Sequence, residues 1–362
     1  MNRKRSVFAV GRMTLTAVLG LLFVYSVPLS WSKTQQERPV RLLHQFQSFS
    51  SFPSSASWGG TVPQVKRITI KSSADGKPQP ALYYNSGNDR KKPLLVALHS
   101  WSDNYNQRIS IPYALWAVVN DWVFIHPDYR GIFNNPDATG SELVVQDIVD
   151  AVQYARKNAN IDPQRIYLMG FSGGAMTALI MAGRHPELWS AVAAFVPVYN
   201  LTDWYEYVIK FPNRHYARHI EASCGGVPDE GSAAARECNR RSPSAYLKNA
   251  RGKSLRIYVA HGIQDDFAPP GNSLRVFNEL AESEDRISEQ DIEYINSRGK
   301  IPSHLTNECF DKLYEEAESP LIFRKTSANV TISLFDGKHD VLYNAGLQWL
   351  SRQTAAQGER RP

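Results

Sequence analysis

Cysteine is scarce in this sequence, with only three among 362 residues, and none of them has a histidine spaced as zinc ligands are. Cys224 and Cys238 lie in one Gly- and Ala-rich segment. Either these two close a small loop and leave Cys309 unpaired, or all three are reduced thiols. The sequence suggests no metal, no nucleotide and no other cofactor.

The sequence also lacks a large excess of positive charge once the residues before Lys33 are left out of the count. The net charge is +6, but the stretch before Lys33 contains no acidic residue and supplies +4 of it, through Arg3, Lys4, Arg5 and Arg12. The remaining +2 is nearly balanced and gives no reason to invoke nucleic acid as a partner.

No apolar run reaches the length typical of a membrane span. The run from Met13 to Val27 is short for that purpose. It follows a basic stretch (Asn2 to Arg5) and precedes small residues, which is typical of a secretory signal peptide. We therefore expect residues 1–32 to be a signal peptide and the mature chain to be secreted or periplasmic. An uncleaved leader that tethers the chain to a membrane is the alternative.

The rest of the chain divides into three parts. Residues 33–58 lack periodicity and are predicted to be a linker or an extended arm, and residues 355–362 a disordered tail. Between them, residues 59–354 alternate buried strands with helical patterns, after a first antiparallel hairpin at residues 65–84. This alternation predicts an α/β fold: a mostly parallel, eight-stranded sheet with helices on both faces.

Two insertions interrupt the alternation, at residues 199–253 and 284–328. Both are predicted to be helical and to lie beyond strand ends, where ligands bind in open α/β sheets. The first is rich in aromatic residues and is the better candidate for a lid. Within it we select Trp204 and Tyr205 as candidate substrate-binding residues. The alternative is that the first insertion only adds helices that pack on the scaffold.

The segment Gly170-Phe171-Ser172-Gly173-Gly174 stands between a predicted strand and a predicted helix. G-x-S-x-G in this context is the pattern of a nucleophile elbow, in which a sharp turn lifts the serine hydroxyl above the sheet. Ser172 is therefore the candidate nucleophile. A serine hydroxyl needs a base to accept its proton and a third group to orient that base.

Both partners follow Ser172 in the chain. The strand at residues 255–260 leads into a loop with Asp265 and Asp266, either of which can supply the acid. The strand at residues 330–335 leads to His339, the candidate base. The order Ser, Asp, His is that of elbow enzymes. Asp340 is too close to His339 in sequence to reach its ring easily, and His261 is expected to pack at a strand end.

An oxyanion hole requires two N–H donors near the serine. The backbone of Gly173 is the first candidate. The second is expected in the loop after the strand at residues 94–98, where we favour the backbone N–H of Trp101, with Ser100 as the alternative.

Together these residues resemble the catalytic domain of the prolyl oligopeptidase family and its esterase relatives in the α/β-hydrolase superfamily. The matching pieces are the elbow, the segment from His261 to Pro269, the segment Gly337-Lys338-His339 and the turn Asp128-Tyr129-Arg130-Gly131. The resemblance implies that Asp265, third after His-Gly, is the acid. Ser100 departs from the glycine usual in such hydrolases, and the chain has no room for the propeller domain of the founding peptidases.

From these features we expect a serine hydrolase that works through an acyl-enzyme, most plausibly on a carboxylic ester. The aromatic insertion suggests an acyl or aryl ester on a carbohydrate. A small exopeptidase of the same family, acting on short peptides, is the alternative enzyme. A non-catalytic binding protein on a hydrolase scaffold is the alternative from another class.

Overall fold

Nine strands form one sheet in the computed structural model of the chain, which describes residues 41–355. The predicted leader at residues 1–32 and nearly all of the predicted tail lie outside this range. The order of the strands is β1-β2-β4-β3-β5-β6-β7-β9-β8. Their bounds are β1 Lys66–Lys71, β2 Pro78–Tyr84, β3 Lys92–Leu98, β4 Val123–Pro127, β5 Ile161–Phe171, β6 Ala191–Phe195, β7 Arg256–Gly262, β8 Leu321–Ser327 and β9 Val330–Phe335.

The pairing of the strands is parallel from β4 through β3, β5, β6 and β7 to β9, and antiparallel at both edges of the sheet. Every residue of β3, β4 and β6 is buried. Continuous apolar runs of this kind are expected where helices cover a parallel sheet on both faces. The predicted α/β class with a mostly parallel sheet is therefore confirmed.

The prediction of eight strands is wrong by one. Strand β8 lies inside the second predicted insertion, which is therefore not wholly helical, and it pairs antiparallel with β9. Only Ala328 and Asn329 connect the two strands, and Ala328 has a φ of 47°. Alanine is uncommon in this conformation. The turn also lacks the glycine that marks most tight hairpins in a sequence, so the sequence does not indicate the hairpin.

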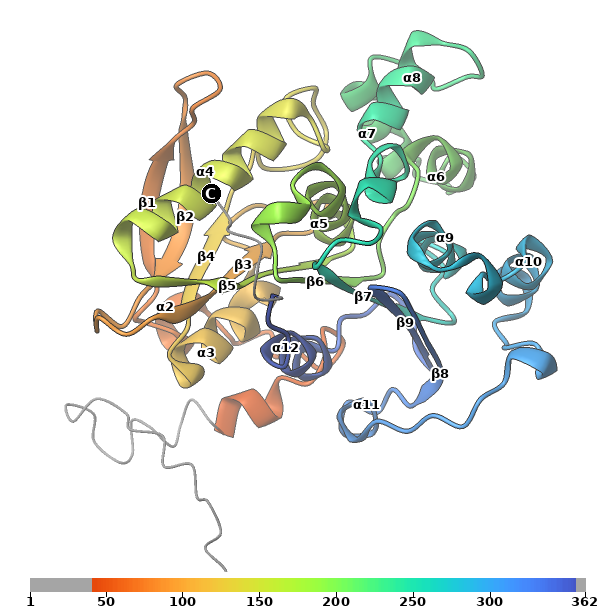
Figure 1. Cartoon of the computed structure of the whole chain (residues 1–362). Helices are drawn as coiled ribbons and strands as arrows, with labels where there is room; N and C mark the ends of the chain where they lie inside the picture. Colours follow the sequence, from red (N-terminus) through yellow and green to blue (C-terminus); the bar gives the residue numbers. More distant parts are fainter. Residues whose placement is uncertain (1–40, 356–362) are drawn as a thin grey trace, which may run out of the picture.

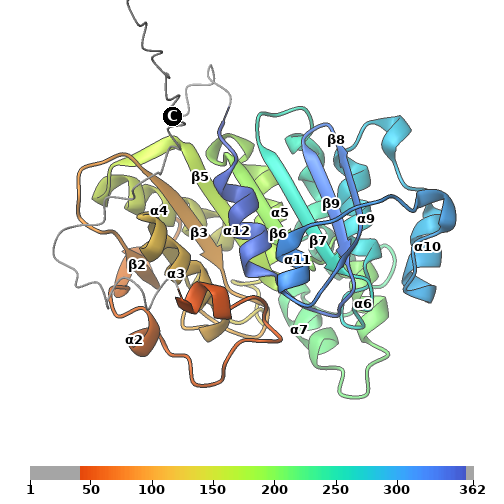
Figure 2. The same cartoon turned by 90° about the horizontal axis from the view of Figure 1, so that it is seen from below.

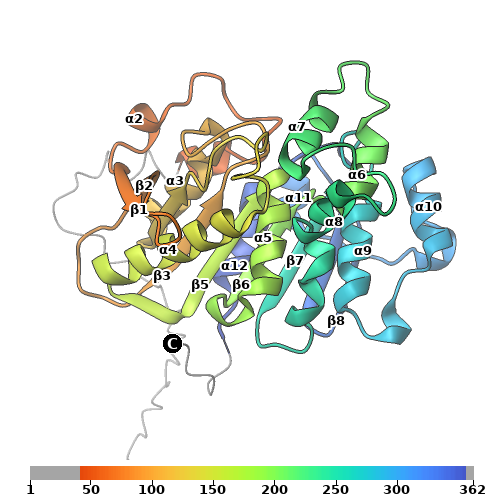
Figure 3. The ribbon, with the colours of Figure 1, turned by 90° about the horizontal axis from the view of Figure 1, so that it is seen from above.

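Helices cover both faces of the sheet (Figure 1). One apolar cluster joins the sheet to α4, α5 and α9, which lie together in Figure 3, and a second joins its other face to α3 and α12, seen in Figure 2. No helix within residues 41–355 has the length and apolar character required to span a membrane. The helices are α2 Trp58–Thr61, α3 Ile111–Asn120, α4 Glu142–Asn158, α5 Gly173–Arg184, α6 Leu201–Val208, α7 His215–Cys224, α8 Ala233–Arg240, α9 Gly271–Leu280, α10 Glu289–Arg298, α11 Lys312–Glu316 and α12 Tyr343–Ser351, preceded by a helical segment at residues 41–45.

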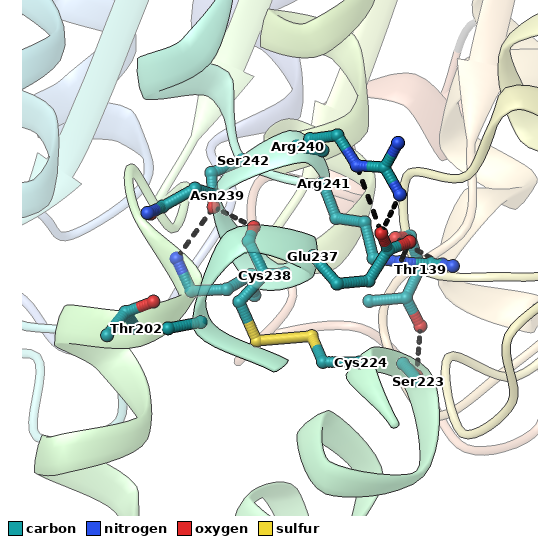
Figure 4. The surroundings of a disulfide bond; sticks show 12 residues. Thr139, Thr202, Ser223, Cys224, Glu237, Cys238, Asn239, Arg240, Arg241 and Ser242 are labelled. Carbon is teal, nitrogen blue, oxygen red and sulfur yellow. Dashed lines mark hydrogen bonds and ion pairs between the residues drawn. A yellow bond between two sulfur atoms is a disulfide. The ribbon is translucent and has the colours of Figure 1, made fainter. Parts of the chain in front are cut away.

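The first insertion contains α6, α7 and α8, which stand together above the sheet in Figure 1. A disulfide between Cys224 and Cys238 links the end of α7 to α8, and Cys309 is free. Figure 4 shows that hydrogen bonds surround this link: Thr139 and Ser223 join their hydroxyls at 2.8 Å, and Arg241 donates to the carbonyl of Ala138. The disulfide thus joins α7 to α8, and the hydrogen bonds of Ser223 and Arg241 join them to the loop before α4.

Candidate active site

The parallel strands bring three loops to one edge of the sheet, because β5, β7 and β9 run in the same direction. Ser172 follows β5, Asp265 follows β7 and His339 follows β9. Residues that are far apart in sequence therefore meet beyond the carboxyl ends of the strands, as open α/β folds require for their sites.

Ser172 occupies a strained turn between β5 and α5. Its φ of 55° and ψ of −119° lie outside the usual regions for a residue with a side chain. Its N–H donates to the carbonyl of Phe195 at 2.9 Å, which holds the turn in place. A Cβ atom at Gly170 would collide with the carbonyl of Gly174, and one at Gly174 would lie 2.5 Å from the carbonyl oxygen of His99. Both flanking glycines of the motif are therefore needed for close packing.

His339 connects Ser172 to Asp265. Its Nε2 lies 2.9 Å from Ser172 Oγ, and its Nδ1 lies 2.6 Å from Asp265 Oδ2. Because an ionised carboxylate only accepts hydrogen bonds, the proton of the neutral imidazole is on Nδ1 and Nε2 is free to accept one. The side chain of Asp266 is exposed, and only its backbone carbonyl is held, by the hydroxyl of Tyr207 at 2.9 Å. Of the two candidate acids, the structure brings only Asp265 to His339.

The Asp265 carboxylate is buried and accepts three more hydrogen bonds, one from His261 and two from backbone N–H groups. Burial by itself raises its pKa, but the hydrogen bonds from His261 and His339 outweigh this effect and hold the pKa well below its ordinary value. The backbone N–H groups of Phe267 and Ala268 donate to Oδ1 at 2.8 and 3.0 Å. Asp265 is therefore ionised at neutral pH and fixed in orientation.

His261 is fully buried at the end of β7, as expected from the sequence, but it also contacts the acid. Its Nε2 faces Asp265 Oδ2 at 3.1 Å and the carbonyl of Ala268 at 2.7 Å, and its Nδ1 lies 2.7 Å from Ser273 Oγ. Since both groups facing Nε2 are acceptors, Nε2 carries the proton. His261 thus donates to the same carboxylate oxygen that His339 contacts, and helps to hold the carboxylate in place.

The backbones of Gly173, which directly follows Ser172, and Trp101 are in close contact. Gly173 begins α5, where a helix N–H has no acceptor within the helix. A Cβ atom at Gly173 would lie only 2.8 Å from the backbone N of Trp101. The N–H of Ser100, the alternative donor, is already bound to Gln107 Oε1 at 2.8 Å. No acceptor for the Trp101 N–H occurs among the described residues.

The loop that carries Trp101 is held by the turn at residues 128–131. His99 Nε2 lies 2.7 Å from the carbonyl of Asp128, and the ring of Tyr129 stacks on His99 at 4.0 Å. The Tyr129 hydroxyl donates to the carbonyl of His99. These contacts explain why the turn accompanies the other motifs of the sequence.

Aromatic side chains of the first insertion pack around the Trp101 indole. Its centroid is 4.9 Å from that of Trp204 in α6 and 6.3 Å from that of Tyr216 in α7. The Trp204 indole N–H donates to the carbonyl of Phe267, whose ring is 5.5 Å from His339 and 45% exposed. We call these four residues (Trp101, Trp204, Tyr216 and Phe267) the aromatic wall.

The two predicted substrate-binding residues occupy different positions. Trp204 belongs to the aromatic wall. Tyr205 is buried between α6 and α7, where its hydroxyl donates to Glu221 Oε1 at 2.7 Å. A second residue of α7, His219, accepts the Trp101 indole N–H on its Nδ1 at 3.2 Å. The sequence did not single out His219, because spacing alone does not show which face of α7 meets the site.

The family comparison agrees with this geometry. The sequence model of the prolyl oligopeptidase family matches residues 139–295, a range that includes Ser172 and Asp265. Residues 139–295 belong to the prolyl oligopeptidase family. Together with the order of the strands, this match assigns the chain an α/β-hydrolase fold.

Three characterised relatives match only parts of this chain. It is 26% identical over 196 residues to feruloyl esterase B of Thermothelomyces thermophilus, which is 50% of this chain and 62% of that protein. It is 44% identical over 48 residues to an acetylxylan esterase of Coprinopsis cinerea, 13% of each chain. It is 31% identical over 100 residues to pyrrolizixenacetamide deacetylase of Xenorhabdus hominickii, 28% of this chain and 36% of that one. The chain thus spans less than two thirds of the length of each of these relatives.

Solved structures of larger peptidases share the fold. Pyrococcus horikoshii acylaminoacyl peptidase aligns with a TM-score of 0.53 at 14% identity, over 82% of this chain and 42% of the peptidase. A putative dipeptidyl aminopeptidase IV from Bacteroides ovatus aligns with a TM-score of 0.51 at 16% identity, over 80% of this chain and 36% of that protein. At these identities the likeness concerns the fold alone.

Proposed function

We propose that this hydrolase cleaves carboxylic esters through a covalent acyl-enzyme on Ser172. The observation that carries the proposal is the continuous hydrogen-bonded path from Ser172 Oγ through His339 to Asp265, beside the paired N–H groups of Gly173 and Trp101. This arrangement supplies a nucleophile, a base, a group that orients the base, and donors for a developing oxyanion.

The reaction follows from these positions. Ser172 Oγ attacks the ester carbonyl carbon while His339 Nε2 takes the hydroxyl proton, and the carbonyl oxygen becomes an oxyanion between the N–H groups of Gly173 and Trp101. His339 then donates the proton to the departing alcohol, which leaves an acyl group on Ser172. Water, deprotonated by His339 Nε2, attacks the acyl carbon. The bond between this carbon and Ser172 Oγ then breaks, Oγ takes the proton back from His339, and the acid is released. Asp265 remains ionised throughout and stabilises the imidazolium.

Two observations support an acyl or aryl ester on a carbohydrate as the substrate. Two of the characterised relatives are a feruloyl esterase and an acetylxylan esterase. The aromatic wall also places apolar rings beside the nucleophile, where a phenolic ring or a sugar face can stack. A short-peptide substrate remains the competing proposal, because the family is named after a peptidase.

The test is a substrate comparison with the purified protein. The panel contains 4-nitrophenyl acetate, methyl ferulate and acetylated xylan as esters, and dipeptidyl 4-nitroanilides as amides, each also tested with Ser172→Ala. Turnover of esters alone, abolished in Ser172→Ala, supports the proposal. Cleavage of the amides favours the exopeptidase, and no turnover of any ester contradicts the esterase assignment.

We also propose that the mature protein is exported. The basic and apolar pattern of residues 1–32 is that of a signal peptide. The Cys224–Cys238 disulfide supports the proposal, since disulfides persist in oxidising compartments. Mass spectrometry of the N-terminal peptide of protein made in its own cells tests it: a new N-terminus close to residue 32 agrees with export, and an intact Met1 contradicts cleavage.

A further inference from the structure

The segment before the first strand packs closely on the catalytic body. Phe46 is buried in the same apolar cluster as α12, and its ring lies 5.4 Å from that of Phe52. Asn344 of α12 donates to the carbonyl of Leu43 at 3.2 Å. The helical segment that precedes these residues lies beside α12 in Figure 2. We call residues 46–52 the arm.

The arm is paired with the chain that follows His339. Ser48 forms an antiparallel bridge with Leu342, Phe49 N–H donates to the carbonyl of Val341 at 3.1 Å, and Tyr343 N–H donates to the carbonyl of Gln47 at 3.0 Å. The arm therefore extends along residues 341–343 as a short added strand. The residue directly before this segment is Asp340, the neighbour of the catalytic base.

Asp340 fastens the arm to the His339 loop with its side chain. Its Oδ1 accepts the N–H groups of Phe49 at 2.8 Å and Ser50 at 3.3 Å, as well as that of its own neighbour Val341 at 2.7 Å. The carboxyl group is buried, with 5% of the residue exposed, and burial raises its pKa. Because a buried acceptor without donors is costly, the arm and Asp340 depend on each other.

The same pairing places Phe49 at the site. The Phe49 ring is 39% exposed and lies 5.5 Å from the ring of Phe171, the residue before the nucleophile. Phe171 in turn lies 5.1 Å from the imidazole of His339. The exposed ring of Phe267 contacts the same imidazole. Of two partly exposed phenylalanines, Phe267 of the acid loop thus contacts His339 directly, and Phe49 of the arm is connected to it through Phe171.

We propose that the arm is a wall of the active site, in which Phe49 contacts an apolar group of the ester and Asp340 positions the arm against the His339 loop. The proposal rests on the esterase function proposed above and narrows its substrate class to esters with an aromatic or long aliphatic group. Such a group covers the exposed ring of Phe49, whereas an acetyl or methyl group is too small to gain from it.

The first test compares Phe49→Ala with the wild type on esters of graded size. We expect kcat/KM to fall about tenfold on methyl ferulate and 4-nitrophenyl octanoate, mainly through a higher KM, and less than about twofold on methyl acetate. Phe310→Ala is the matched control, because Phe310 is 74% exposed and has no ring contact with the site residues. Equal effects of Phe49→Ala on large and small esters, or no effect on any, overturn the role of Phe49.

The second test separates positioning from substrate contact. Asp340→Ala removes the acceptor of the arm, and we expect kcat and the rate of fluorophosphonate labelling at Ser172 to fall about tenfold on all esters. Asp340→Asn keeps Oδ1 as an acceptor and is expected to restore most of that activity. Thermal unfolding of each variant reports whether the fold is intact.

The two proposals fail in different ways. If the wild type hydrolyses esters and Asp340→Ala folds but keeps the wild-type kcat, only the positioning role is contradicted. If the wild type is labelled at Ser172 yet hydrolyses no ester, the proposed function fails, and the substrate role of Phe49 fails with it.

Discussion

Gly173 and Trp101 touch through their backbones: a Cβ atom on Gly173 would lie 2.8 Å from the Trp101 N and 2.9 Å from its Cα. This close approach of the two backbones is possible only while residue 173 has no side chain. A methyl group at this position would displace Trp101, whose N–H is the second donor of the proposed oxyanion hole.

Gly173→Ala is predicted to separate the two donors. Because loss of one oxyanion donor costs roughly 10²- to 10³-fold in kcat, we expect a fall of that order for every ester, with little change in KM. Steady-state kinetics measure this. Gly59→Ala is the control, since nothing lies within 4 Å of a Cβ atom there. Wild-type kcat in Gly173→Ala would contradict the assigned oxyanion hole.

Asp265→Asn is predicted to abolish most activity and to alter the acid stability. The amide N–H₂ is a donor and cannot accept the hydrogen bond from His339 Nδ1, so the imidazole is held in the wrong tautomer. In a comparable triad this costs about 10⁴-fold in kcat. Since folding lowers the Asp265 pKa, the unfolded chain takes up a proton first as the pH falls. This carboxylate therefore stabilises the fold above its unfolded pKa, and the stabilisation is lost as the pH drops toward the folded value.

Denaturant unfolding at several pH values between about 6 and 3 measures the second effect, because the unfolded pKa of an aspartate is about 3.9. The wild-type free energy of unfolding should fall more steeply on acidification than that of Asp265→Asn. Asp266→Asn, one residue along the chain, should match the wild type in both activity and pH dependence. Equal loss of activity in Asp265→Asn and Asp266→Asn would contradict the assignment of Asp265 as the acid of the triad.

His219→Leu is predicted to loosen the Trp101 loop, because it removes the acceptor of the indole N–H. Burial, then His215 and Arg218, lower the His219 pKa from 6.5, so its Nδ1 can accept at neutral pH. As the pH falls through 6.5, the unfolded chain binds this proton before the folded one does, and stability decreases. We expect a several-fold lower kcat in His219→Leu, a smaller acid loss of stability, and neither effect in His185→Leu.

The disulfide joins residues 14 apart in sequence, and its loss is predicted to cost about 3 kcal/mol in the free energy of unfolding. The double variant Cys224→Ser, Cys238→Ser tests this by denaturant unfolding. Cys309→Ser, which removes the free thiol, should leave the stability close to that of the wild type. Equal stability of the double variant and the wild type would contradict a formed disulfide.

The class of the fold could be predicted because its information is local. Continuous apolar strands such as residues 94–98 alternate with amphipathic helices, and each pattern fits within about ten residues. Strand β8 was not predicted because Ala328 and Asn329 form the turn to β9 without a glycine. Strand β6 ends at Phe195, where Val196 takes a φ of 48° that no pattern in the sequence indicates.

The candidate triad could also be read from short motifs, since each member follows a strand end directly. The surrounding residues could not, because their contacts join distant segments. Phe49 and Asp340 are 291 residues apart, and Trp101 and His219 are 118 apart. No periodicity in either segment indicates these contacts, so residues 33–58 were predicted only to be a linker or an extended arm, and His219 was not selected.

The measurement that tests the central claim most directly is the location of a fluorophosphonate adduct by peptide mass spectrometry. A mechanism through Ser172 predicts a single modified residue, Ser172, and predicts that His339→Ala suppresses the labelling while the protein remains folded. A folded wild-type protein that takes up no label, or an adduct on any other serine, would contradict the account.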